Sequence, residues 1–477
     1  MDTDDSGLSN RYPYHLCHDT CNQRRWGQVS ADGRPMTESL SSSDAMRLAV
    51  QRLYDADPAG EWARMDRHRT EFAVTLRALH EYLPRPPARV LDCGGGPGRY
   101  AVELARQGYQ VVLFDLSAGN LDLARQKAAD AGVMLAAYEQ GTALDLSPFA
   151  DGEFDAVLLM GPLYHLLEES ERRQALAEAH RVLRSGGPLI AAFIARYAAH
   201  RDCAAGYPDL LLAQRGDYDR ILADGRLPPP DDGHVAFVAY FAHPTEVAPV
   251  CWSSGFEVAA VLGVEGVVSA SEDEINKLDG PAWDRWLDVN WQVAPDPCIH
   301  GGVEHLLVVA HKPAWREVLK RIVRHLDEAE APYIVVGGTS LALHGLPLRV
   351  KDLDIETDVA GAYRFAALFT EHTIMPMALR ESAFYRSHFG QYDFDGVQIE
   401  VMACLERREG DAWVATQASN TNVVEVDGMP VNVSWLEEEA LAYIRRGRLD
   451  RAALCLPRCD RERLLALLRG TQPAFVL

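Results

Sequence analysis

The chain has 477 residues, and a typical size of roughly 150 residues per domain predicts two or three domains. Apolar residues make up 48% and charged residues 24%, which excludes a fibrous or wholly disordered protein. The formal net charge of −22 argues against non-specific binding to DNA or to anionic membranes, although it leaves open one structured RNA held in a local basic groove.

The cysteine spacing, the length of the apolar runs and the start of the chain indicate the cellular location. Nine cysteines are irregularly spaced, which indicates reduced thiols. No run of about 18 apolar residues occurs, so we expect no membrane span. The acidic start of the chain has neither a basic nor an apolar segment typical of a signal peptide. We therefore expect a cytoplasmic protein.

The first part of the chain alternates short apolar runs with helical patterns. Residues 1–44 are polar and aperiodic, so we expect a disordered or loosely attached tail. Residues 45–313 then form one expected domain, because buried strands separated by helices are typical of a mostly parallel sheet with helices on both faces. The expected strands are 88–93, 109–115, 154–160, 188–193, 256–262 and 305–310, and the clearest helices are 117–130 and 168–183.

A glycine-rich turn follows the first expected strand. Asp92 precedes three glycines in a D-x-G-x-G-x-G pattern, and a helix opens at Pro97. Glycine lets the backbone pass close to a ligand. The last interval is one residue shorter than in a dinucleotide-binding turn, and an acid at this place suits a cationic ligand group. Asp115 ends the second strand, where a carboxylate can bind both hydroxyls of a ribose.

This pattern resembles the class I S-adenosylmethionine-dependent methyltransferases, over about residues 46–313. The segments 154–167, 181–187 and 239–256 add to the resemblance. It implies a Rossmann-like α/β fold and S-adenosylmethionine as the cofactor. The family often has an acid after the third strand to accept the adenine amino group, and this chain has threonine there. The cofactor-binding residues implied by the resemblance are Asp92, Gly94 and Gly96 at the methionine part, Asp115 and Leu116 at the ribose, Thr142 and Ala143 at the adenine, and Met160 and Gly161 at the pocket border.

Methyl transfer requires alignment of the acceptor with the methyl group and exclusion of water. A base is needed only when the nucleophile must lose a proton. His165, just past the fourth strand, is the candidate base, since histidine titrates near neutrality. The alternative is a structural histidine at a helix start. Tyr54 and Trp62 on an expected lid helix either hold a small organic acceptor or pack in the core.

The second part of the chain, residues 314–477, is expected to form another domain. A strand at 333–337 leads into Gly337, Gly338, Thr339 and Ser340, a turn that can present backbone N–H groups to phosphates. Asp352 and Asp354 are two apart on a strand and project to one side. Two carboxylates without basic partners favour a cation between them, and hard oxygen ligands favour Mg²⁺. Glu400 lies between apolar residues of a further strand, where an idle buried carboxylate would be costly.

These residues resemble the nucleotidyltransferase superfamily over about 316–410, with helices to 470 as its variable tail. The resemblance implies a small α/β nucleotidyltransferase fold with C-terminal helices. By that resemblance Gly338 with Thr339 or Ser340 holds a nucleoside triphosphate. Asp352 and Asp354 bind Mg²⁺, and Glu400 activates the acceptor hydroxyl.

The basic residues of this part have two interpretations each. Arg349 and Lys351 either serve the triphosphate or are solvated charges. The cluster Arg445, Arg446 and Arg448 fits a solvated helix end better than a binding site for RNA or phosphate.

The sequence therefore predicts a bifunctional transferase. It methylates an acceptor, most simply a small molecule, with S-adenosylmethionine, and it transfers a nucleoside monophosphate from a Mg²⁺-bound nucleoside triphosphate. One alternative is a methyltransferase whose second domain binds nucleotide without turnover. Another is an RNA-directed or toxin–antitoxin-like regulatory protein. The sequence specifies neither the acceptor, nor the methylated atom, nor the nucleotide, nor the oligomeric state.

Overall fold

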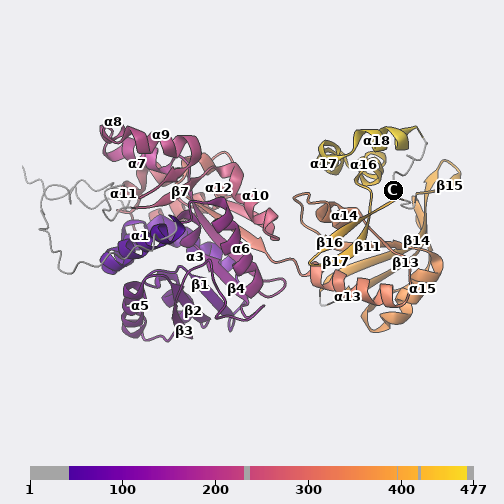
Figure 1. The fold of residues 1–477 in the computed structure, drawn as a ribbon, viewed down its shortest axis with the longest axis horizontal. Coiled ribbons are helices and arrows are strands. Elements are labelled where there is room, and N and C mark those ends of the chain that lie inside the picture. Colours follow the sequence, from indigo (N-terminus) through magenta and orange to yellow (C-terminus); the bar gives the residue numbers. More distant parts are fainter. Residues whose placement is uncertain (1–41, 230–236, 395, 417–419, 470–477) are drawn as a thin grey trace, which may run out of the picture. The chain divides into compact units, whose positions relative to one another are not determined.

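The computed structural model describes residues 42–229, 237–394, 396–416 and 420–469. The chain divides into two compact units, Met1–Lys312 and Pro313–Leu477 (Figure 1). The expected N-terminal tail lies outside the described residues, apart from 42–44, which belong to the first turn of α1 (Ser42–Ala56). No helix in the described part of the chain is long and apolar enough to cross a membrane.

The first unit contains a nine-stranded sheet in the order β3-β2-β1-β4-β5-β7-β6, with β9 pairing both β5 and β8. The pairs from β3 to β5 and the β5–β7 pair are parallel, and the pairs that involve β6, β8 and β9 with their partners are antiparallel. This mostly parallel sheet confirms the predicted Rossmann-like α/β class. The strands are β1 (Arg89–Cys93), β2 (Gln110–Asp115), β3 (Ala137–Gln140), β4 (Ala156–Leu159), β5 (Pro188–Ala195), β6 (Arg226–Leu227), β7 (Ala239–Ala242), β8 (Glu257–Gly263) and β9 (His305–His311).

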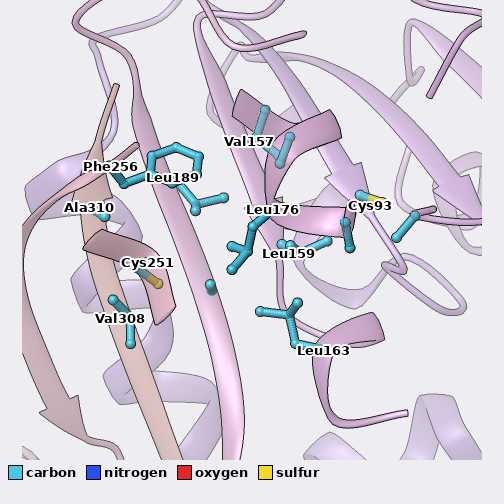
Figure 2. Packing of buried hydrophobic residues seen from close by; sticks show 14 of the residues in the cluster. Cys93, Val157, Leu159, Leu163, Leu176, Leu189, Cys251, Phe256, Val308 and Ala310 are labelled. Carbon is cyan, nitrogen blue, oxygen red and sulfur yellow. The ribbon is translucent and has the colours of Figure 1, made fainter. Parts of the chain in front are cut away.

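Helices cover both faces of this sheet, which is why its strands are apolar on both sides. On one face, α6 and α10 bring Leu176 and Cys251 against Val157, Leu189 and Val308 (Figure 2). On the other face, α3, α4 and α5 pack on the alternate residues of the same strands. The helices are α2 (Pro58–Arg67), α3 (Arg69–Tyr82), α4 (Arg99–Arg106), α5 (Ala118–Asp130), α6 (Glu169–Val182), α7 (Ala198–Gly206), α8 (Leu210–Ala213), α9 (Arg215–Asp224), α10 (Pro244–Ser253), α11 (Glu272–Ile275) and α12 (Gly280–Val293), with 3-10 turns η1 (Pro162–Tyr164), η2 (Gly266–Ser271) and η3 (His300–Gly302).

The second unit contains an eight-stranded mixed sheet in the order β12-β13-β14-β11-β10-β17-β16, with β15 pairing the end of β14. The β11–β14 and β10–β17 pairs are parallel and the others antiparallel. The strands are β10 (Ile334–Val336), β11 (Asp352–Thr357), β12 (Thr373–Glu381), β13 (Tyr385–Phe394), β14 (Val397–Glu409), β15 (Ala412–Ala415), β16 (Thr421–Val426) and β17 (Met429–Ser434).

Two groups of helices complete the second unit. The amphipathic α13 (Trp315–Glu328) and α15 (Val359–Leu368) pack on the sheet in one apolar core. A second, smaller core joins α14 (Gly337–Leu343) to α16 (Leu436–Arg445) and α17 (Leu449–Cys455). The remaining elements are η4 (Thr370–His372), η5 (Leu456–Arg458) and α18 (Arg461–Leu468). The expected α/β unit with C-terminal helices is confirmed, and the β12–β13 hairpin is an addition to it.

Candidate active sites

A cavity of about 150 Å³ opens where the carboxyl ends of β1, β2 and β4 meet. The predicted cofactor-binding residues of the first unit, together with His165 and Tyr54, line it, because parallel strands bring their carboxyl ends to one edge of the sheet. The cofactor-binding residues among them are Asp92, Gly94, Gly96, Asp115, Leu116, Thr142, Ala143, Met160 and Gly161. Trp62, the other aromatic residue of the expected lid, is not among the lining residues and packs against the core.

Asp92 is a fully buried carboxylate without a protein partner. Its side chain is 0% exposed, and neither carboxylate oxygen has a hydrogen bond within the described residues. Burial, together with the nearby charge of Asp115, raises the pKa of Asp92 to about 7. A buried polar group without a partner is unfavourable. The site is therefore suited to a ligand group that carries positive charge and N–H donors.

The glycine turn beside Asp92 packs backbone against backbone. Gly94 has a φ of +71°, and a Cβ there would lie 2.4 Å from a ring carbon of Pro162. A Cβ on Gly161 would lie 2.6 Å from the carbonyl oxygen of Gly94. Only glycine fits at these two positions, and the close approach of the two loops leaves their backbone as a wall of the cavity.

Asp115 clamps the turn to the end of β2. Its carboxylate accepts hydrogen bonds from the N–H groups of Gly96 and Ser117, each at 2.8 Å, and from Asn120 Nδ2 at 3.3 Å. Burial raises the pKa of Asp115, and these three donors oppose the shift. Three of the roughly four lone-pair positions of the carboxylate are used within the protein, which leaves acceptor capacity toward the cavity. Ser117 also caps α5 by accepting from the Asn120 N–H.

His165 does not have a free ring nitrogen. Its Nδ1 lies 2.6 Å from the carbonyl oxygen of Val238, which can only accept, so Nδ1 carries the proton. Nε2 lies 2.7 Å from the Tyr54 hydroxyl, which therefore donates to it. Burial lowers the pKa of His165 to about 4. This geometry fits the structural alternative for His165 better than the role of base, because the ring is neutral and positions Tyr54.

An ion-pair network that the sequence analysis missed reaches the same cavity. Arg64 lines the cavity and donates to both oxygens of Glu71, at 2.7 and 3.1 Å, and to Glu61 at 3.1 Å. Behind it, His305 Nδ1 lies 3.8 Å from Glu71 and 2.7 Å from Glu265. The signal in the sequence was the seven-residue spacing of Arg64 and Glu71, but this spacing does not reveal His305 of β9 or Glu265, which lies just before η2.

Attraction between opposite charges outweighs the effect of burial on the pKa values in this network. Burial would raise the pKa of Glu71, but Arg64 and His305 outweigh it and hold that pKa at about 2. Burial would lower the pKa of His305, but Glu71 and Glu265 raise it to about 9. Ligand-type atoms of Glu71, Glu265 and His305 lie within 4.8 Å of one another, as in a metal site. The two cationic side chains already balance the two carboxylates, so the arrangement is an ion-pair network.

The second unit has a larger cavity, of about 840 Å³, beside β11 and α16. Of the predicted residues, Gly337, Asp354 and Glu400 line it. Strand register explains this, because Asp354 is paired with Val336 on one side and with Glu400 on the other. Asp352 lies two residues before Asp354 on β11 and pairs with Gln398, and it does not line this cavity. The other predicted residues that do not line it are Gly338, Thr339 and Ser340.

The carboxylates of this cavity repel one another. Burial, followed by the charges of Asp352, Glu400 and Glu439, raises the pKa of Asp354 well above its ordinary value. Gln391 Nε2 donates to Glu400 at 2.8 Å and orients it. Such a donor set fits a hard divalent cation. In the described parts of the chain, however, the oxygens of Asp352, Asp354 and Glu400 are not all within 4.8 Å of one another.

The polar groups of the predicted phosphate-binding turn form hydrogen bonds within the protein. The Thr339 hydroxyl donates to the carbonyl oxygen of Asp352 at 2.8 Å. The Ser340 hydroxyl lies 2.9 Å from that of Ser434, and both Thr339 and Ser340 are fully buried. The predicted contact of these two hydroxyls with a triphosphate does not fit this geometry, because both hydroxyls already bond inside the fold. The Gly337 N–H likewise donates to Glu439, at 2.8 Å.

The cations of the cavity come from positions that the sequence did not favour. Arg445 and Arg446 line it, although their cluster was interpreted as a solvated helix end. Arg349 and Lys351 are exposed and are not among the lining residues. The signal for Arg446, the C-cap residue of α16, is its seven-residue spacing from Glu439, which places it at the end of the helix face that carries Glu439. The other lining arginines are Arg380 and Arg407.

Comparisons with known proteins agree with this division. Residues 90–187 match the family model of a methyltransferase domain, and residues 318–454 match that of aminoglycoside-2''-adenylyltransferase. The demethylmenaquinone methyltransferase of Deinococcus radiodurans is 40% identical over 115 residues, which are 24% of this chain and 46% of that protein. The glycine/sarcosine N-methyltransferase of Parasynechococcus marenigrum is 32% identical over 173 residues, 35% of this chain and 56% of that protein. This chain thus spans about half the length of the curated relatives it matches.

Among solved structures, a nucleotidyltransferase from Thermotoga maritima is 31% identical. The alignment covers 33% of this chain and 93% of that one, with a TM-score of 0.27.

Proposed function

Because the chain joins an S-adenosylmethionine-dependent methyltransferase domain to a domain of the adenylyltransferase family, we propose that it is a bifunctional transferase. It methylates a small polar acceptor with S-adenosylmethionine and transfers a nucleoside monophosphate from a Mg²⁺-bound nucleoside triphosphate to a hydroxyl. The observation that carries the first activity is the buried, unpartnered carboxylate of Asp92 at the glycine turn.

The first cavity has a complement for each polar part of the cofactor. Asp92 takes the ammonium of the methionine moiety, and Arg64 has N–H groups left over from its bonds to glutamates to take the carboxylate. Asp115 presents its remaining lone pair to the ribose. Thr142 borders the adenine position in place of an acid. S-adenosylmethionine supplies a methyl group on a sulfonium, from which an aligned nucleophile displaces it.

The chain's own contribution to methyl transfer is alignment and exclusion of water. Helix α1 covers the cavity with Met46, Val50 and Tyr54. The Tyr54 hydroxyl is hydrogen-bonded to His165, and partial burial raises its pKa well above the ordinary value, so it stays protonated. His165, the histidine of this cavity, has both ring nitrogens bonded within the protein and does not serve as a base, which suits an amine acceptor that attacks as the free base.

In the second unit, Asp354, which lines the cavity, and Asp352, which lies two residues before it on β11 outside that lining, would hold Mg²⁺. Glu400 would accept the proton of the acceptor hydroxyl. The metal ion supplies charge stabilisation at the attacking and leaving oxygens. Arg445 and Arg446 are placed to hold the triphosphate. Glu356, Glu381 and Glu438 add negative charge to the cavity wall, which suits an acceptor with ammonium groups.

The acceptor class follows from both cavities together. A small molecule that carries amines and hydroxyls, such as an aminoglycoside or a related amino sugar, provides a nitrogen or oxygen for methylation and a hydroxyl for nucleotidyl transfer. The family name of the second domain and the net charge of −22 support this acceptor over a nucleic acid. One observation favours a second candidate, a methyltransferase with a silent nucleotide-binding domain: the Gly337 N–H and the Thr339 and Ser340 hydroxyls are all bonded within the protein.

Calorimetric titration separates these functions. The full-length protein is titrated with S-adenosylhomocysteine and, separately, with each Mg²⁺–nucleoside triphosphate, with Asp352→Ala/Asp354→Ala as the control. Binding of both ligands, with the triphosphate signal lost in the control, supports two working sites. A triphosphate signal that persists in the control supports the silent domain, and no binding of S-adenosylhomocysteine would refute the assignment of Asp92.

A further inference from the structure

We propose that Glu439 of α16 is a fourth carboxylate of the metal-binding site in the second unit. One of its oxygens holds the Gly337 turn, and the other faces the divalent cation together with Asp354. This inference rests on the proposed nucleotidyl transfer, and it adds a residue from a helix that lies outside the glycine turn and the two acidic strands.

The two carboxylate oxygens of Glu439 differ in their hydrogen bonds. Oε1 accepts from the Gly337 N–H at 2.8 Å and from the Ser434 hydroxyl at 2.6 Å. Oε2 has no hydrogen bond among the described residues, and it is not one of the fully enclosed atoms. The side chain is only 7% exposed, and it lines the same cavity as Asp354 and Glu400. Glu439 therefore shares one cavity with Asp354 and Glu400, and Oε2 is its oxygen without a hydrogen bond among the described residues.

Gly337 brings Glu439 and Asp354 together. Its φ of +67° turns the chain at the end of β10, and a Cβ there would lie 2.2 Å from Asp354 Oδ2. The N–H of the same residue is bonded to Glu439. Both carboxylates thus approach the same glycine, Glu439 at its N–H and Asp354 where a Cβ would lie, and only glycine leaves room for Asp354 there.

The charges around this glycine are unbalanced. The charges of Asp352, Glu400 and Glu439 act on Asp354, and the cation Arg446 acts on both Asp354 and Glu439. If Glu439 served only as an acceptor for Gly337 and Ser434, a neutral amide would do so without the penalty of a buried charge. A carboxylate at this place is favourable when a divalent cation binds beside it.

The substitution Glu439→Gln removes the charge of this side chain while keeping its hydrogen bonds to the fold. In Glu439→Gln the two donors require the amide oxygen to face them, so the bonds to Gly337 and Ser434 are retained and the –NH₂ group faces the cavity. Glu438→Gln is the matched control: this neighbouring glutamate lines the same cavity but bonds to Asn420. Ser434→Ala is the scaffold control, since it removes the hydroxyl that bonds to Glu439 and Ser340 but removes no charge.

The test is the affinity of the full chain for Mn²⁺ alone, measured from the electron paramagnetic resonance signal of the free ion, with melting temperatures in parallel. We expect Glu439→Gln to raise the Kd by about 10-fold or more. We expect Glu438→Gln and Ser434→Ala to change it by less than about 2-fold, while Ser434→Ala lowers the melting temperature. A Glu439→Gln variant that melts like wild type and binds Mn²⁺ as tightly would overturn this inference alone. Wild-type protein that binds no Mn²⁺, or binds it equally in Asp352→Ala/Asp354→Ala, would overturn the proposed metal site itself.

Discussion

Replacing Asp92 by asparagine should make the empty protein more stable and abolish cofactor binding. The folded-state pKa of Asp92 is about 7, against an ordinary value of 3.8, because the carboxylate is buried beside Asp115. The folded state therefore holds a proton that the unfolded state has lost, and stability falls as the pH rises from about 4 to 7. A difference of about 3 pH units corresponds to a penalty of about 4 kcal/mol above pH 7, which Asp92→Asn removes.

Urea denaturation of the ligand-free protein at pH 8 measures this gain. The contrasting variant is Asp115→Asn, which should destabilise, because this carboxylate accepts three hydrogen bonds that an amide cannot all accept. A ligand-free Asp92→Asn protein that is less stable than wild type would show that the ionised Asp92 carboxylate does not destabilise the fold.

The binding half of the same prediction concerns pH. The ionised fraction of Asp92 falls from about one half at pH 7 to about one hundredth at pH 5, so the Kd of wild type for S-adenosylhomocysteine should rise about 50-fold over that range. Calorimetry at several pH values checks this. An affinity that does not change with pH, or that Asp92→Asn retains, would show that the carboxylate does not contact the ligand.

Four further predictions concern other residues. His305 has a folded-state pKa of about 9, so its ionised form should stabilise the folded state by about 3 kcal/mol below pH 6.5, and this stabilisation should be lost as the pH rises through 9. Melting curves between pH 6.5 and 9.5 measure this loss. A melting temperature that does not change over this range would contradict the ion-pair network. The pH–rate profile of methyl transfer should show no ionisation of His165 between pH 6 and 8, and Tyr54→Phe should cost about 1 kcal/mol of stability by urea denaturation. Gly161→Ala should eliminate S-adenosylhomocysteine binding in calorimetry, because its Cβ would meet a carbonyl oxygen at 2.6 Å; normal binding would mean that the loop moves at little cost. Arg446→Ala should weaken triphosphate binding by about 10-fold, whereas the same change at exposed Arg349 should have no effect.

The first site could be predicted from the sequence because its residues are set by strand ends. Asp92 and Asp115 close neighbouring parallel strands, and the glycines between them are required by close backbone contacts. The partners of His165 could not be predicted in this way. Val238 and Tyr54 are 73 and 111 residues away from it, and only the folded structure shows that they occupy both ring nitrogens.

The second site was predicted in part for the same reason. Asp354 and Glu400 are paired on adjacent strands, and their alternation with apolar residues marks the face they share. Glu439 and Arg446 come from a helix whose docking on the sheet depends on the small core with α14 and α17. Local sequence shows that the two share a helix face but not what that face meets.

The most direct measurement of the central claim is mass spectrometry of acceptors after reaction. A panel of aminoglycosides is incubated with the full-length protein, S-adenosylmethionine, Mg²⁺ and each nucleoside triphosphate, with Asp92→Asn and Asp352→Ala/Asp354→Ala in parallel. We expect one compound to gain both a methyl group, which is absent with the first variant, and a nucleoside monophosphate, which is absent with the second. A methyl gain that persists in Asp92→Asn, or a nucleotide gain that persists without Asp352 and Asp354, would contradict it.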